Sequence, residues 1–98
     1  MMSKQGLVMS KEDNVATVVE EVSTGEKVTI RMGGETKEIK VTEAIPFGHK
    51  FCLAEIKKGE DVIKYGESLG AANQDINVGD YVHVHNLDSK RGRGDMID

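Results

Sequence analysis

The sequence predicts an all-β fold, a compact barrel-like domain of short strands with at most a short helical turn. Two observations carry this prediction: a period-two alternation of apolar residues and a set of glycine-centred turns. Val28, Ile30 and Met32 share one face of segment 27–32, which is typical of a half-buried strand. Many short strands joined by glycine turns favour a compact, twisted β architecture.

A β-hairpin is predicted around Gly33 and Gly34. Both glycines are free to take positive φ, and an alternating face of Lys37, Ile39 and Val41 resumes directly after them. The alternation on both sides of the glycine pair therefore predicts two antiparallel strands.

Two further strands are predicted upstream, at 7–9 and 15–19, with a polar cluster of turn formers at 10–14 between them. The second segment is too dense in β-branched valine to favour a helix. A helical turn near Ser68 to Ala72 is the one departure from strand that we allow.

A short pattern marks three turns. In each copy an apolar residue is followed three positions later by glycine, then by an acid, and two positions after that by valine. The copies start at Val22, Ile56 and Ile76. We expect the glycine to take the left-handed turn position and the acid to stay in water. Uneven spacing excludes a solenoid.

The composition predicts one domain with a thin core. The chain has 98 residues, of which 38% are apolar and 4% aromatic, without tryptophan. Extra burial against a partner would therefore help this core. We expect the domain to cover residues 1–89 and a flexible polar tail to follow at 90–98, where arginines could dock onto a partner.

Charge and hydropathy exclude several function classes. The net charge of −4 provides no broad basic surface, so a nucleic-acid partner is not expected. No apolar stretch is long enough for a membrane span, and the start has no signal region. The single cysteine, Cys52, suits a reducing compartment. We expect a cytoplasmic protein.

Three histidines are the first candidates for chemistry. His83 and His85 would point to the same side of a strand, with Cα atoms roughly 6.5 to 7 Å apart, while Val82 and Val84 face the core. Both rings could reach one metal ion, carboxylate or hydroxyl, but the sequence contains no third metal ligand close to them. The alternative is two polar residues on a solvated strand face.

The bend at Pro46 leaves His49 and Lys50 on a loop. A lysine beside a histidine suits an anionic substrate, although an ordinary turn with a solvated lysine is an equal alternative. For Tyr65 we favour packing on the core, and Gly66 could let a ligand approach the backbone.

The ordered motifs resemble the SAF domain of the altronate/galactarate dehydratase family, which also includes the sulfolactate sulfo-lyase small subunit. The motifs are Asp13-Asn14-Val15, Ile45-Pro46-x-Gly48-His49-Lys50, Val62-Ile63-Lys64-Tyr65-Gly66-x-x-x-Gly70 and Gly79-x-x-Val82-His83-Val84-His85-Asn86. The resemblance spans nearly the whole chain and implies a β-clip fold. It also implies a role as small subunit or N-terminal domain of a lyase that removes water from a polyhydroxy acid.

The resemblance further implies which residues line the shared site. The catalytic candidates are His49, His83 and His85, and the substrate-binding candidates are Lys50, Asn86 and Lys64. Fe²⁺ or Mn²⁺ would be held mainly by a large catalytic subunit, with His83 and His85 as candidate contributors. The isolated chain would be inactive, and a homo-oligomer is an alternative assembly for it.

Two other function classes stay open. A stand-alone SAF module could bind a sugar or other anion without catalysis, and a small metal-binding protein would rest on the His83 and His85 pair alone. Which sugar acid or sulfo-acid is the substrate does not follow from the sequence.

Overall fold

The computed structural model describes residues 4–32 and 34–89, which form an all-β domain. The strands are β1 (Lys4–Leu7), β2 (Val15–Val18), β3 (Lys27–Met32), β4 (Glu35–Lys40), β5 (Lys50–Cys52), β6 (Asp61–Lys64), β7 (Glu67–Ala72), β8 (Tyr81–Val82) and β9 (Leu87–Ser89). The predicted fold class is confirmed, and the architecture is consistent with a β-clip. The prediction of a helical turn near Ser68 to Ala72 is wrong, because this segment lies in strand β7.

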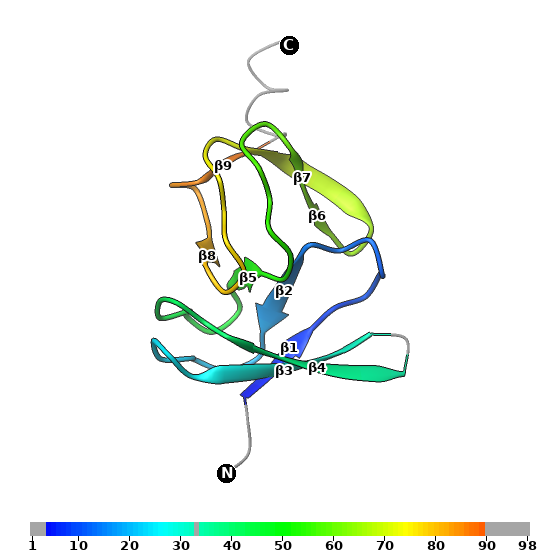
Figure 1. Cartoon of the computed structure of the whole chain (residues 1–98), viewed down its shortest axis with the longest axis vertical. Coiled ribbons are helices and arrows are strands. Elements are labelled where there is room, and N and C mark those ends of the chain that lie inside the picture. The colour runs from blue at the N-terminus through cyan, green and yellow to red at the C-terminus, as the bar shows by residue number, and fades with distance from the viewer. Residues whose placement is uncertain (1–3, 33, 90–98) are drawn as a thin grey trace.

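The strands form two sheets (Figure 1). The larger has the order β4-β3-β1-β2-β5-β8, and the smaller has the order β6-β7-β9. In Figure 1 the β3–β4 hairpin lies at one end of the domain and the smaller sheet at the other, with β2, β5 and β8 between them. No helix in the described ranges is long and apolar enough to cross a membrane. The expected tail at 90–98 lies outside the described residues.

The β3–β4 hairpin confirms the period-two prediction. Val28 pairs with Ile39, and Ile30 pairs with Lys37 on the neighbouring strand. Val28, Ile30 and Ile39 are all buried, because their alternating positions point toward the core. Gly34 takes the positive φ that the tight connection requires.

The first strand begins earlier than predicted. β1 covers Lys4–Leu7 and pairs with both β2 and β3, whereas Val8 and Met9 follow the strand. Met9 is 72% exposed and Leu7 is 47% exposed, so these two side chains do not contribute to the core.

Two apolar cores share the strands β2 and β5. Alternate residues point to opposite sides, so that Ala16 and Phe51 belong to one core and Val15 and Cys52 to the other. All four residues of β2 are buried, which explains its nearly continuous apolar sequence. Because β2 and β5 lie between the two cores, the loops at the ends of these strands are held in place.

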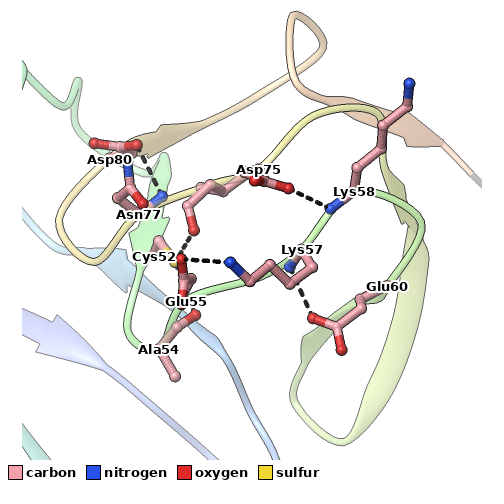
Figure 2. A network of polar contacts seen from close by, with 10 residues as sticks. Cys52, Ala54, Glu55, Lys57, Lys58, Glu60, Asp75, Asn77 and Asp80 are labelled. Atoms are coloured by element: carbon pink, nitrogen blue, oxygen red, sulfur yellow. Dashed lines mark hydrogen bonds and ion pairs between the residues drawn. The ribbon is translucent and has the colours of Figure 1, made fainter.

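The three repeated turns are closed by their acids. Glu26, Glu60 and Asp80 each accept a hydrogen bond from the backbone N–H three residues earlier, at 2.6, 2.7 and 2.9 Å. Figure 2 shows the last two of these contacts, to Lys57 and Asn77. Each preceding glycine has positive φ, as predicted. The acids therefore do more than stay in water, since they accept the hydrogen bonds that close the turns.

Candidate functional site

A fourth turn of the same shape places His49. Gly48 has a φ of 81°, and the His49 N–H donates to the Pro46 carbonyl at 3.0 Å, like the corresponding bonds in the other turns. His49 occupies the position that an acid takes in the three repeated turns. The pattern Ile45-x-x-Gly48 was the sequence signal for this turn. The His49 side chain reaches from this turn to Tyr81 in β8.

The segment after β8 departs from the predicted strand. β8 ends at Val82, and residues 83–86 form a turn. The backbone N–H groups of Asn86 and Leu87 both donate to the His83 carbonyl at 3.0 Å, which bends the chain out of the sheet. Val82 is buried as predicted, but the prediction that Val84 faces the core is wrong because Val84 is 76% exposed.

The three histidines gather around Tyr81. His49 and His83 have ring centroids 4.9 Å apart. Tyr81 stacks on His83 at 5.4 Å with an interplanar angle of 7°, and it lies 5.7 Å from the rings of both His49 and His85. Sequence reasoning missed Tyr81, although its position two residues before His83 was the available signal.

A hydrogen bond joins Tyr81 to His49, with 2.7 Å between the tyrosine oxygen and His49 Nδ1. β5 and β8 hold the two residues together through the pairs Lys50 with Val82 and Phe51 with Tyr81. His49 directly precedes this pairing, and His83 directly follows it. The strand register therefore brings together two sequence motifs that are more than thirty residues apart.

Charges of both signs lie beside the histidine cluster, since Lys50 follows His49 in the chain and the Glu43 carboxylate accepts the Tyr81 N–H at 3.3 Å. Burial lowers the pKa of Lys50, and the nearby Lys64 lowers it further. Burial also lowers the pKa of His83, and the positive charges of His49, Lys50 and His85 act in the same direction. Lys50 therefore lies close enough to both Lys64 and His83 for the charges to interact. An anionic ligand would relieve the repulsion between these groups.

The segment around Lys64 is held by the Asp13-Asn14 motif. Asp13 is 5% exposed, and its Oδ1 accepts the Gly66 N–H at 2.8 Å. Asn14 Oδ1 accepts the Ile63 N–H at 2.7 Å. The two side chains therefore connect the β1–β2 loop to the β6–β7 hairpin, and their hydrogen bonds hold the hairpin backbone on either side of Lys64.

Tyr65 does not cap the core, contrary to the prediction. It takes a φ of 54° and is 43% exposed. Its ring lies 5.0 Å from Lys64 Nζ, where the aromatic face attracts the ammonium group. The tight turn that Gly66 completes leaves the tyrosine ring on the surface, beside the lysine.

Asn86 lies inside the histidine loop. It is 5% exposed, its Oδ1 accepts the His83 N–H at 3.0 Å, and its Nδ2 donates to the Tyr81 carbonyl at 2.8 Å. These contacts make Asn86 a frame for the backbone that carries Tyr81 and His83. Its predicted contact with substrate stays a prediction.

The described residues contain no group of three or more His, Cys, Asp or Glu side chains that could hold a metal ion. His83 and His85 therefore do not form a metal centre from this part of the chain alone. The donor set is rich in cations and aromatic rings, which suits an oxygen anion better than a bare cation.

Comparisons with known proteins agree with the sequence motifs. Residues 4–90 match the family model described as the altronate/galactarate dehydratase SAF domain. The chain is 38% identical over 93 residues to (2R)-sulfolactate sulfo-lyase subunit alpha of Chromohalobacter salexigens, covering 92% of this chain and 99% of that protein. It is 36% identical over 83 residues to altronate dehydratase of Bacillus subtilis, covering 85% of this chain.

The relatives differ greatly in length. The match spans 16% of the Bacillus subtilis altronate dehydratase and 14% of the Escherichia coli altronate dehydratase, to which this chain is 38% identical over 74 residues. The sulfo-lyase subunit, in contrast, is matched over nearly its whole length. Because the family model covers almost all of the sequence, the chain belongs to the SAF-domain family of altronate/galactarate dehydratases.

Proposed function

We propose that this chain serves as the small subunit or N-terminal domain of a sugar-acid dehydratase and contributes substrate-site residues to a large catalytic subunit. The observation that carries the proposal is the convergence of His49, His83 and His85 around Tyr81, with Lys50 beside them. The family membership supports an elimination as the reaction class, since the relatives are named dehydratase or sulfo-lyase. The proposed substrates are polyhydroxy acids related to altronate or galactarate.

The cluster suits an elimination from a hydroxy acid. Such a reaction removes a proton α to the carboxylate and expels the β-hydroxyl as water, so it needs a base, an acid and groups that bind the carboxylate. Lys50 and Lys64 would bind the carboxylate. The histidines would exchange protons, and His83 stays neutral near pH 7 because its pKa is lowered. This is the form in which an imidazole can accept a proton.

The metal that the resemblance implies, Fe²⁺ or Mn²⁺, would be held mainly by the large subunit. The described residues of this chain offer no set of three ligands for it. His83 and His85 would supply at most two ligands to a site completed by the partner.

An apolar rim next to the histidines supports a partner subunit. Phe47, two residues before His49, is 70% exposed, and Val84, between His83 and His85, is 76% exposed. Large apolar side chains on two adjoining loops are typical of a surface that another protein covers. Two of the relatives are named subunit alpha, which indicates a multi-subunit enzyme for those proteins. We propose the cytoplasm as the compartment, consistent with the free thiol of Cys52.

Reconstitution tests the proposal. The purified, metal-loaded chain alone should not turn over altronate, galactarate or sulfolactate, whereas co-expression with a matching large subunit should yield a complex that dehydrates one sugar acid. Lys50→Met should reduce the activity of the complex. Lys57→Met is the matched control, because Lys57 is exposed and paired with Glu55. Turnover by the isolated chain, or equal activity of both variants, would contradict the proposal.

A stand-alone anion-binding module is the second candidate. It is favoured by the cationic cluster, which the single chain assembles without a partner. Isothermal titration of the isolated chain with galactarate distinguishes the two. Tight binding together with failure to form any active complex would favour the module.

A further inference from the structure

We propose that Tyr81 is a positioning residue that fixes His49 as a hydrogen-bond donor, with the tyrosine hydroxyl donating to His49 Nδ1 and the Nε2–H left for an oxygen of the substrate. The identity of that oxygen, on a sugar acid, rests on the proposed function. The tyrosine–histidine pair itself is a property of this chain alone.

The direction of the hydrogen bond follows from the acidity of the two groups. Tyr81 Oη and His49 Nδ1 are 2.7 Å apart, which is a short hydrogen bond. A phenol is a stronger acid than a neutral imidazole, and an imidazole nitrogen is a stronger base than a phenol oxygen. The proton therefore lies on Tyr81 and points at Nδ1. Since a neutral imidazole carries one proton, that proton must lie on Nε2.

Both partners are held firmly enough to maintain this geometry. The Tyr81 carbonyl accepts from Asn86 Nδ2 at 2.8 Å, and the tyrosine ring stacks on His83. On the other side, the His49 carbonyl accepts from the Val18 N–H at 2.9 Å. Tyr81 extends from β8 and His49 from the turn directly before β5, and the pairing of these two strands keeps the two side chains together.

The fixed tautomer gives His49 and His83 different roles in proton transfer. A neutral His49 with Nε2–H can donate to a carboxylate or hydroxyl oxygen, but it cannot take a proton at that nitrogen. His83 stacks on the Tyr81 ring and has no such tyrosine bond. Burial lowers its pKa, and the positive charge of Lys50 acts in the same direction, so its neutral form is favoured. Of the two adjoining rings, His49 is therefore the donor and His83 is the ring suited to accept a proton.

Nitrogen NMR tests the pair on the complete 98-residue chain. At about pH 8 a histidine of ordinary pKa is neutral, and a long-range ¹H–¹⁵N correlation distinguishes a protonated from an unprotonated ring nitrogen. In the wild type, His49 Nε2 should be protonated and Nδ1 unprotonated. Tyr81→Phe keeps the ring but removes the hydroxyl, so both tautomers should become populated. Tyr65→Phe alters the other tyrosine of the chain and should leave His49 unchanged.

Two results would overturn the pair: a wild-type His49 protonated at Nδ1, or a Tyr81→Phe spectrum identical to that of the wild type. If Tyr81→Phe does not fold, the wild-type spectrum decides alone.

The reconstituted enzyme tests the donor role separately. Tyr81→Phe should lower kcat by roughly 10- to 100-fold, the usual range for a residue that orients a site ligand, with KM nearly unchanged and Tyr65→Phe without effect. Full activity of Tyr81→Phe would overturn the donor role. An inactive wild-type complex would count against the proposed function, while the NMR result on the tautomer would stand by itself.

Discussion

Replacing Asn86 tests whether its side chain holds in place the loop that carries His83 and His85. Replacing Asn86 with Ala removes two hydrogen bonds, from the His83 N–H and to the Tyr81 carbonyl, at 3.0 and 2.8 Å. Each bond contributes about 1 kcal/mol net, and a buried backbone group left without a partner costs about 1–3 kcal/mol. Because Asn86 is only 5% exposed, water replaces these contacts poorly. We expect Asn86→Ala to lower the free energy of unfolding by about 2–4 kcal/mol.

Urea denaturation followed by circular dichroism measures this loss. The midpoint should fall while the slope with denaturant stays the same, since the unfolded state is unaffected. Asn86→Asp should not restore wild-type stability, because the carboxylate still accepts from His83 but places an oxygen against the Tyr81 carbonyl in a buried position. Asn77→Ala is the matched control. Its side chain is exposed, so the change should stay within about 0.5 kcal/mol.

If Asn86→Ala changes stability by less than about 0.5 kcal/mol while the reconstituted enzyme loses activity, then Asn86 contacts substrate and does not frame the loop. A loss of both stability and activity supports the framing role, because Tyr81 and His83 depend on the same backbone.

Three further outcomes are expected. Gly79→Ala should destabilise the chain by at least about 1 kcal/mol more than Gly59→Ala in the same urea assay. Both glycines have a φ of 93°, but a Cβ at Gly79 would overlap the Lys40 carbonyl oxygen. Equal losses of stability would contradict this packing. Phe47→Asp should leave the chain folded but prevent co-purification with the large subunit, since this side chain is 70% exposed; retained binding would exclude Phe47 from the interface. The pKa of His83, followed by NMR, should lie below its usual value and rise when galactarate is added, because an anion favours the charged imidazole. Because the pKa of His83 is lowered in the folded chain, the unfolded chain binds this proton more readily. The contribution of His83 to the free energy of unfolding is therefore fully present above about pH 6.5 and is lost as the pH falls below that value. His83→Gln should remove this pH dependence.

The β3–β4 hairpin and the glycine turns could be predicted because their causes are local. Val28 and Ile30 alternate with polar residues, and glycine at a turn position signals positive φ within a few residues. The site residues on loops could be proposed from motifs, but their arrangement could not. The period-two rule predicted a strand through Val84, and the hydrogen bonds of Asn86 overrode that local preference.

The sequence by itself determined the all-β class, the main hairpin, the turn positions and the family, because each depends on residues close together along the chain or on an ordered set of motifs. Only the tertiary structure decided that Tyr81 lies among the three histidines and that its hydroxyl meets His49. It also decided that the Asp13 and Asn14 side chains bind the β6–β7 hairpin that carries Lys64. These contacts depend on strand register and on side chains that tie distant loops together. Such long-range geometry comes from the packing of the whole domain and leaves no periodic signal in the sequence.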